Sequence, residues 1–297
     1  MNKEKIEQAL KTAWAARELE FFPVIDSTNN VAKAAGLDGH KSGFLAVADK
    51  QDAGRGSRGR SWVSPSGYNV FMSLMVRPEL PMDKVSGLTL VMALSIAEGI
   101  EKVLNRKLFQ PEESESRLQP EESESRFWSE ESESRFQPGI KWPNDIVLNK
   151  RKICGILTEL HMMPDQKDYF VVIGVGINVN QPVELFPEEI RETAGSILSE
   201  SGKEIDRAAL IAACMKAFEE NFEKYVRAHN LSELRESYEK RLLNIGRQVR
   251  ILDPKGEYEA EALGVNDEGA LLIRLSDGRE ETINAGEVSV RGLYGYV

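Results

Sequence analysis

The stretch that decides the fold is Gly139–Asn178, which reads GIKWPNDIVLNKRKICGILTELHMMPDQKDYFVVIGVGIN. Its apolar residues form runs rich in Ile and Val, and turn-forming residues such as Pro143-Asn144-Asp145 separate these runs. This pattern is typical of neighbouring strands in a buried sheet. We therefore expect strands at 140–142, 146–148, 152–161 and 169–175.

Helix and strand patterns alternate on both sides of this stretch. Residues 3–19 place Ile6, Leu10 and Trp14 near one face of an amphipathic helix. Ser27 is a candidate N-cap for a second helix, which runs through Ala35. Further helices are expected at 84–105, 193–200, 207–228 and 231–242, and strands at 19–25, 44–50 and 69–77.

The character of the sequence changes at Gly246. Short strand patterns follow each other in about fifty residues, separated by turn sequences, which indicates a small SH3-like β-barrel. These strands are expected at 248–252, 258–265, 270–274, 280–284 and 287–290. The predicted fold class is α+β: an N-terminal helix at 1–20, a mixed-sheet domain at 21–243 with an insertion at 110–138, and the β-barrel at 244–297.

Composition excludes several classes of protein. Among the 297 residues, no apolar run reaches the roughly 18 residues of a membrane span. The charged N-terminus lacks the pattern of a secretory signal, and two Cys do not make a disulfide scaffold or zinc cluster. A net charge of −10 argues against broad nucleic-acid binding. We expect a cytoplasmic protein without a membrane or DNA partner.

The insertion at 110–138 consists of acidic repeats. The hexamer EESESR begins at Glu112, Glu121 and Glu130, and the stretch contributes −6 to the net charge. So few apolar residues cannot offset the entropy lost on ordering, so we expect a disordered or weakly helical surface insertion. A partner-docking segment, using Leu118, Phe127, Trp128 and Phe136, is the alternative.

A Gly/Arg-rich loop is expected at 51–60, where Gly54–Arg60 reads GRGSRGR. Glycines let backbone N–H groups approach an anion closely, and arginines donate forked hydrogen bonds to phosphate or carboxylate. A flexible solvated loop and an RNA-binding Arg-Gly run remain alternatives. The position between two strands favours an anion site.

Two further motifs lie within Gly139–Asn178. KWPND (141–145) is turn chemistry, but Lys141 offers a cation for phosphate and Asp145 a carboxylate for Mg²⁺. GVGIN (174–178) lacks the third glycine and the following helix of a dinucleotide-binding loop, so its glycines are interpreted as making room for a ligand.

The order of these motifs resembles that of biotin protein ligases. The matching segments are DSTN (26–29), Gln51 with GRGSRGRSW (54–62), KWPND (141–145), RKICGIL (151–157) and GVGIN (174–178). The resemblance covers about residues 20–297 apart from the acidic insertion. It implies a biotin/lipoate ligase-like catalytic domain at 21–243, followed by the SH3-like domain.

The resemblance also implies roles for individual residues. Lys152, Arg55 and Arg60 are the expected catalytic residues, and Asp145 is a candidate Mg²⁺ ligand. Trp62 and Phe71 are expected to wall the pocket. The expected biotin contacts are Ser27, Thr28, Asn29, Gln51, Arg55, Gly56, Ser57, Lys152 and Gly155. The expected ATP or adenylate contacts are Arg58, Arg60, Trp62, Lys141, Asn144, Asp145, Gly174, Gly176 and Asn178.

By this resemblance the protein is an enzyme that uses biotin, ATP and Mg²⁺ to form biotinyl-5′-AMP. A lysine of a biotin carboxyl carrier domain then takes the biotinyl group, and a homodimer is a further expected partnership. The alternatives are a biotin-sensing regulatory protein with little transfer activity and a lipoate-type ligase of the same fold.

Two positions depart from the family pattern. The family motif is Arg-Gly-Arg-x-Gly-Arg, and here Ser57 replaces the second Arg. This resembles engineered proximity-labelling ligases, which release biotinyl-AMP; a natural serine compensated by Arg58 is the alternative. Residues 1–20 hold one helix, too little for the helix-turn-helix domain of bifunctional family members. That helix is interpreted as a natural cap or as the remnant of a removed domain.

Overall fold

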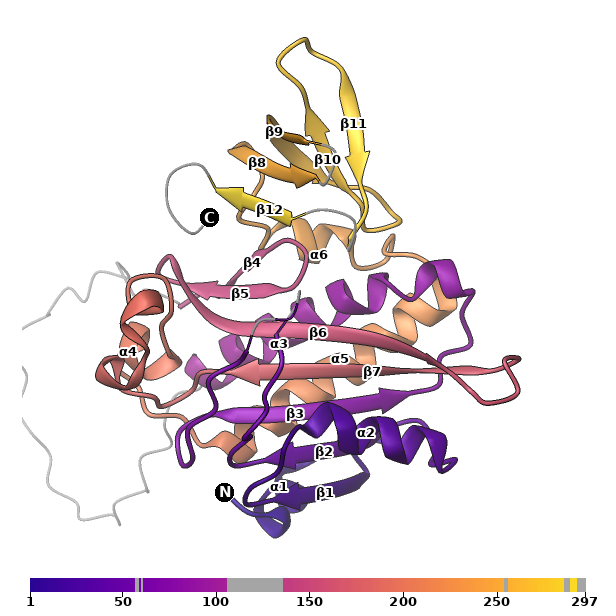
Figure 1. Ribbon diagram of the computed structural model, residues 1–297, viewed down its shortest axis with the longest axis vertical. Coiled ribbons are helices and arrows are strands. Elements are labelled where there is room, and N and C mark those ends of the chain that lie inside the picture. Colours follow the sequence, from indigo (N-terminus) through magenta and orange to yellow (C-terminus); the bar gives the residue numbers. More distant parts are fainter. Residues whose placement is uncertain (57–58, 60, 106–135, 254–255, 286–288, 293–297) are drawn as a thin grey trace, which may run out of the picture.

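The computed structural model describes residues 1–297 except 57–58, 60, 106–135, 254–255, 286–288 and 293–297 (Figure 1). The helices are α1 (Lys3–Ala9), α2 (Thr28–Leu37), α3 (Gly87–Leu104), α4 (Ile197–Ser201), α5 (Arg207–Ala228) and α6 (Arg235–Glu239). The first seven strands are β1 (Glu18–Phe22), β2 (Phe44–Ala48), β3 (Val70–Val76), β4 (Gly139–Lys141), β5 (Asp145–Leu148), β6 (Arg151–Met162) and β7 (Tyr169–Ile177). The remaining strands are β8 (Gln248–Asp253), β9 (Gly256–Val265), β10 (Leu271–Arg274), β11 (Glu280–Ile283) and β12 (Ser289–Gly292).

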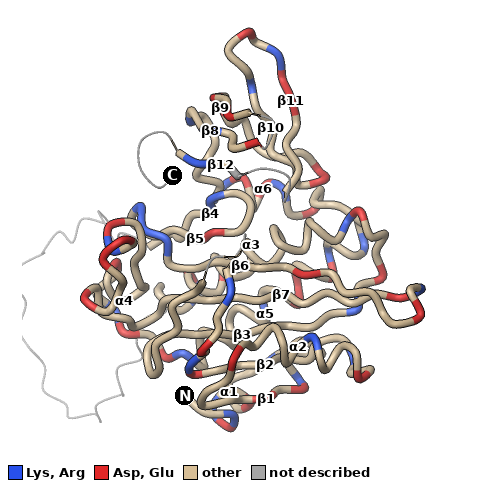
Figure 2. Tube along the Cα trace, in the orientation of Figure 1, with Lys and Arg blue, Asp and Glu red and all other residues tan. Residues whose placement is uncertain are grey.

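The larger sheet has seven strands in the order β1-β2-β3-β7-β6-β5-β4. Only β1 and β2 pair in parallel; the other neighbours are antiparallel, so the sheet is mixed as predicted. The central strands β3 and β7 contain no charged residue, which Figure 2 shows as uninterrupted tan tubes. Strands buried on both faces are expected to have this composition.

Helices cover both faces of this sheet (Figure 1). On one face α3 and α5 pack against alternate residues of the central strands, such as Leu74 and Ile173. On the other face α2 packs with Ala32 against Phe170 and Val172. Because successive strand residues point to opposite faces, Gly174 and Gly176 continue the row of Phe170 and Val172. The α2 face therefore has no side chains at the end of β7.

The second sheet has five antiparallel strands in the order β11-β10-β9-β8-β12. Trp142 joins it to the larger sheet: its Nε1 donates to the carbonyl of Gly269 at 3.0 Å, and its backbone N–H donates to Asn244 Oδ1 at 2.9 Å. The ring is 2 % exposed, so burial reinforces both hydrogen bonds. The predicted fold class, a mixed-sheet domain followed by a small β domain, is confirmed.

Two predicted helices are wrong in extent. The helix expected at 3–19 ends at Ala9, because Ala16 adopts a φ of 61° and the backbone N–H groups of residues 13–15 bond to the Glu219 carboxylate. The helix expected at 231–242 is reduced to α6, because Leu243 N and the carbonyl of Arg241 bond to Ile140 instead. Tertiary hydrogen bonding overrides helical patterning in both segments.

The helix expected at 193–200 is also shorter, since α4 begins only at Ile197. The preceding Ala194 forms a bridge with Lys152, and Ser196 and Ser199 form a capping box. Most of the acidic insertion lies outside the described residues. In the part of the chain that is described, no helix has the length and apolar character that crossing a membrane requires.

Candidate active site

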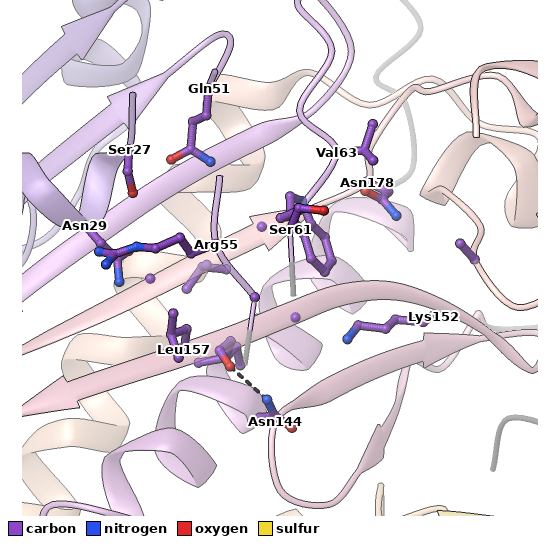
Figure 3. Close-up of a pocket in the computed structure, with 18 of the residues that line it drawn as sticks. Ser27, Asn29, Gln51, Arg55, Ser61, Val63, Asn144, Lys152, Leu157 and Asn178 are labelled. Atoms are coloured by element: carbon purple, nitrogen blue, oxygen red, sulfur yellow. Dashed lines mark hydrogen bonds between the residues drawn. The ribbon is translucent and has the colours of Figure 1, made fainter. Parts of the chain in front are cut away.

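A pocket opens on the α2 face of the larger sheet, over the ends of β6 and β7 (Figure 3). Its cavity measures about 270 Å³. Figure 3 shows Ser27, Asn29 and Gln51 toward one end, and Lys152 and Asn144 toward the other. The pocket brings together thirteen of the residues predicted from sequence: Ser27, Thr28, Asn29, Gln51, Arg55, Gly56, Trp62, Asn144, Lys152, Gly155, Gly174, Gly176 and Asn178.

Other predicted site residues do not line this pocket. Lys141 is buried in β4, Asp145 reaches the site through Lys152, and Phe71 is fully buried in β3. Ser57, Arg58 and Arg60 lie outside the described residues. Lining residues to which the sequence assigned no role are Ser61, Val63, Ile156, Leu157, Val175, Phe186, Ile190, Thr193 and Ala194; of these, Ser61, Ile156, Leu157 and Val175 lie within the quoted motifs.

The floor of the pocket is made of glycine. Gly155 of β6 and Gly176 of β7 are register partners, and a Cβ atom on either would lie 2.8 or 2.7 Å from the Trp62 ring. A Cβ on Gly174 would lie 2.1 Å from Asn29 Oδ1. No side chain fits at these distances, so these glycines allow Trp62 and Asn29 to lie directly on the sheet. The glycines of GVGIN thus make room for two side chains that line the pocket, and a direct approach of a ligand to them stays a prediction.

One end of the pocket is a polar network. Gln51 Oε1 accepts from the backbone N–H of Thr28 at 2.8 Å and from its hydroxyl at 3.1 Å. Ser73 Oγ lies 2.7 Å from Thr28 Oγ1 and 2.6 Å from Asn29 Oδ1. Thr28, Asn29 and Ser73 are all nearly inaccessible to solvent, so their hydrogen bonds are stronger than surface ones. This end can bind a compact polar group.

The other end carries a cation. Lys152 Nζ lies 2.6 Å from Asp145 Oδ1 and 5.3 Å from the centroid of the Trp62 ring. Asn144 fixes the turn beside it, because its Nδ2 donates to the carbonyl of Ile156 at 2.9 Å. An ammonium held against an aromatic ring and a carboxylate can bind the carboxylate or phosphate of a ligand.

Trp62 joins the two ends. Its buried Nε1 has no hydrogen-bond partner among the described residues. Buried polar atoms in folded proteins are normally paired, so an indole N–H left over beside an open pocket fits a ligand acceptor.

Arg55 stands at the start of the Gly/Arg loop. It forms a bridge with Ser61, and Trp62 N donates to the carbonyl of Gly54, so the two ends of the loop are closed together. Its Nη2 donates to Asn30 Oδ1 at 3.0 Å. Hydrogen bonds from Asn30 and from the Ser27 backbone lower the pKa of Asp26, which keeps that carboxylate ionised below this loop.

Cys154 is not a candidate nucleophile. Its thiol is fully buried on the α3 face of β6, and burial raises its pKa well above the ordinary value. A thiol attacks as its thiolate, so this cysteine is inert at neutral pH.

A magnesium site made by the chain alone is not seen in the described part of the sequence, which holds no group of three His, Cys, Asp or Glu able to bind a metal. Asp145 is the carboxylate nearest the cation end, and Lys152 already contacts it. Mg²⁺ is usually held by substrate phosphates with one or two carboxylates. These residues fit an ion that arrives with a nucleotide.

Comparison with known proteins identifies the family. Residues 21–178 match the Biotin/lipoate A/B protein ligase family, and residues 245–291 match the Biotin protein ligase C terminal domain. The chain belongs to the biotin protein ligases. The predictions of the family and of an enzyme of this class are therefore confirmed.

Individual relatives agree with this family. The chain is 34% identical over 285 residues to the bifunctional ligase/repressor BirA of Bacillus spizizenii, covering 96% of this chain and 78% of that protein. It is 27% identical to a biotin–[acetyl-CoA-carboxylase] ligase of Mycobacterium tuberculosis, covering 92% and 88%. The structure of the Aquifex aeolicus biotin protein ligase with biotin and ATP superposes with a TM-score of 0.72 at 27% identity, covering 93% and 99%. Biotin and ATP, the substrates predicted from sequence, are bound in that relative.

Proposed function

We propose that this biotin protein ligase joins biotin to a lysine of a biotin carboxyl carrier domain in two steps. In the first, a biotin carboxylate oxygen attacks the α-phosphorus of ATP and pyrophosphate leaves. In the second, the lysine amine attacks the carbonyl carbon of biotinyl-5′-AMP, the bond to the AMP oxygen breaks, and the amine loses a proton. The observation that carries this proposal is the pocket with a polar network at one end and Lys152 at the other.

The residues divide the work along the pocket. The network of Thr28, Asn29 and Gln51 binds the polar ring system of biotin, which has a carbonyl and two N–H groups. Lys152 then lies where the carboxylate and α-phosphate meet, and its charge stabilises the negative charge that develops there. Mg²⁺ bound to the ATP phosphates would neutralise the leaving pyrophosphate, with Asp145 as the carboxylate nearest this position.

The amine nucleophile of the second step comes from the partner protein. The pocket is open at the side lined by Val63 and Ile190, which are 44% and 40% exposed. Exposed apolar side chains at the mouth are compatible with a protein surface covering it. A homodimer, and the domain limits 1–20, 21–243 and 244–297, stay predictions.

The finer part of the proposal concerns Ser57. An arginine at this position supplies a forked, charge-assisted donor, worth about 1.5–3 kcal/mol, which corresponds to roughly ten- to a hundredfold in retention of the adenylate. With serine there, biotinyl-AMP escapes before a carrier lysine arrives and acylates nearby amines. We therefore propose leaky, promiscuous labelling in addition to carrier biotinylation.

Mass spectrometry of two targets tests both parts. A carrier domain and serum albumin are incubated with enzyme, biotin and ATP. We expect one biotinylated carrier lysine and slow, scattered labelling of albumin; Ser57→Arg should remove the scattered labelling and keep the carrier product. Pyrophosphate release without carrier labelling would instead support a biotin-sensing protein. A preference for lipoate over biotin in the first step would support a lipoate-type ligase.

If the Ser57 enzyme labels only the carrier, or if Ser57→Arg labels albumin equally, promiscuous labelling is excluded while the ligase function stands.

A further inference from the structure

Glu159 lies on β6 outside the residues that line the pocket, yet it contacts two that do. Its Oε2 accepts from Asn29 Nδ2 at 2.6 Å and lies 3.6 Å from Arg55 Nη2. Asn29 is 6 % exposed, whereas the Arg55 side chain is 47% exposed, so the bond to Asn29 is the stronger of the two contacts. Neither the motifs nor the reaction steps give this carboxylate a role.

The charge of Glu159 decides which way the Asn29 amide points. An ionised carboxylate accepts hydrogen bonds and cannot donate them. Asn29 must therefore turn its Nδ2 toward Glu159, and its Oδ1 faces Ser73 Oγ, 2.6 Å away. Gly174 leaves room for the amide but offers no side chain that could prefer either orientation. Among the residues that the structure describes around this amide, the Glu159 carboxylate is the group that distinguishes the two orientations.

The rest of the network accepts either orientation of this amide. The Ser73 hydroxyl has one hydrogen, and it lies within hydrogen-bond distance of both Asn29 and Thr28. It can donate to Asn29 Oδ1, or accept from Asn29 Nδ2 and donate to Thr28 Oγ1. Gln51 is fixed separately, because its Oε1 accepts the Thr28 backbone N–H. Without a charge at position 159, both orientations of Asn29 would satisfy their neighbours.

We propose that Glu159 is a specificity-determining positioning residue, which makes Asn29 present an N–H donor to a ligand carbonyl. With Nδ2 engaged by Glu159 through one hydrogen, Asn29 keeps its second amide hydrogen for the pocket. The ureido oxygen of biotin is such a carbonyl acceptor. This assignment rests on the proposed function, in which this end of the pocket binds the ring system of biotin.

Glu159→Gln removes the charge with almost no change in shape. The glutamine can accept from Asn29 or donate to it, so both orientations become accessible. If they are equally populated, biotin binds only about twofold more weakly. The larger effect is on 2-iminobiotin, in which an imino nitrogen carrying hydrogens replaces the ureido oxygen and needs an acceptor. In Glu159→Gln, the binding of 2-iminobiotin no longer requires Asn29 to turn its Oδ1 toward a negatively charged carboxylate.

The experiment measures the dissociation constants of biotin and 2-iminobiotin by calorimetry without ATP, for the unchanged chain and for Glu159→Gln. We expect the preference for biotin to fall about tenfold or more, the value of a charge-assisted hydrogen bond. 2-Iminobiotin is a cation when its guanidine group is protonated. Loss of the carboxylate charge would by itself weaken the binding of this cation and raise the preference for biotin. A fall therefore cannot come from long-range electrostatics.

Glu98→Gln is the matched control, because Glu98 accepts from Asn221 Nδ2 at 2.8 Å between α3 and α5, away from the pocket. It should leave both constants unchanged. A preference for biotin that is unchanged or higher in Glu159→Gln would overturn the proposal, as would an equal fall in Glu98→Gln. Failure of the unchanged chain to bind biotin would instead refute the proposed function itself.

Discussion

Replacing Lys152 with methionine is the most direct test of the cation end of the pocket. Methionine keeps the unbranched stem against Trp62 and removes the ammonium, whose Nζ lies 2.6 Å from Asp145 Oδ1. The Lys152 side chain is 25% exposed. The backbone N–H of Lys152 donates to the carbonyl of Thr193 and its carbonyl accepts from Gly195 N, and a new side chain leaves both hydrogen bonds in place. The fold should therefore survive, and the loss should appear in the chemistry.

The expected magnitude follows from one charge-assisted contact to the reacting groups. Such a contact contributes about 1.5–3 kcal/mol, so kcat/KM for adenylate formation should fall roughly ten- to a hundredfold. Removal of the ammonium also leaves the Asp145 carboxylate without this neutralising neighbour, close to the incoming phosphates. The double variant Lys152→Met with Asp145→Asn should thus be less impaired than Lys152→Met alone.

Biotin-dependent exchange of labelled pyrophosphate into ATP measures this step without a carrier protein. Lys203→Met is the matched control: its Nζ also lies over an aromatic ring, 5.5 Å from the centroid of Phe136, and donates to the carbonyl of Leu104. It should exchange at the unchanged rate. Exchange by Lys152→Met within about twofold of the unchanged chain would refute the assignment of Lys152 to the reaction.

Three further predictions concern the floor, the N-terminal segment and the insertion. In Gly176→Ala the new Cβ would lie 2.7 Å from the Trp62 ring, so Trp62 should be displaced and the KM for ATP in the exchange assay should rise. If this clash is the cause, adding Trp62→Phe to the same chain should lower the KM part of the way back. Glu219→Gln should lower the free energy of unfolding at pH 7 by about 1.5–3 kcal/mol, because a carboxylate that is 2 % exposed accepts the backbone N–H groups of residues 13–15. Burial alone would raise the pKa of Glu219, but those N–H groups hold it below the ordinary value for a glutamate. The difference in stability between the two proteins in urea titrations should therefore be complete above the ordinary pKa and vanish as the pH falls through the lowered one. Asn105 Nδ2 contacts the carbonyl of Phe136 at 3.4 Å, so the described residues on either side of the insertion lie together. Deleting 112–135 should therefore change the melting temperature little. A melting temperature that falls by several degrees in calorimetry would show that the repeats pack on the rest of the protein.

Local patterning predicted the strands of the larger sheet well, because turn residues bound most of them and apolar residues predominate in them. Helix α5 also matches its predicted limits, since Asp206 caps its first turn and His229 turns left-handed at its end. The segments at 10–17 and 231–242 were predicted wrongly because their backbone hydrogen-bond partners, Glu219 and Ile140, are distant in sequence.

In the candidate site, too, local motifs predicted some residues, and contacts between segments distant in sequence left others unpredicted. Its polar and glycine residues occur in short motifs, because phosphate, carboxylate and close backbone approach each demand particular residue types. The apolar wall from Phe186, Ile190 and Ala194 has no such signal, since any side chain of suitable size can exclude water there. Glu159 was missed for another reason: an exposed-looking strand glutamate gains meaning only once Asn29 is found beside it, 130 residues away in sequence.

The described ends of the Gly/Arg loop indicate where the effect of Ser57 should arise. Before the loop, Arg55 is held by Asn30 and Glu159; after it, Asp49 Oδ2 accepts from Gly67 N at 3.0 Å, and Asp49 Oδ1 accepts from Arg207 at 2.7 Å. Hydrogen bonds from Ser66 and Arg207 lower the pKa of Asp49 despite its burial, so this anchor stays ionised at neutral pH. The segments on either side of position 57 are thus held by residues outside the Gly/Arg loop. A change there should alter how long the adenylate is retained without altering how biotin binds at the network end. Leaky labelling and normal biotin affinity are therefore compatible in one protein. Ser57 variants should change the retention of the adenylate, whereas Glu159 variants should change the preference for biotin over 2-iminobiotin.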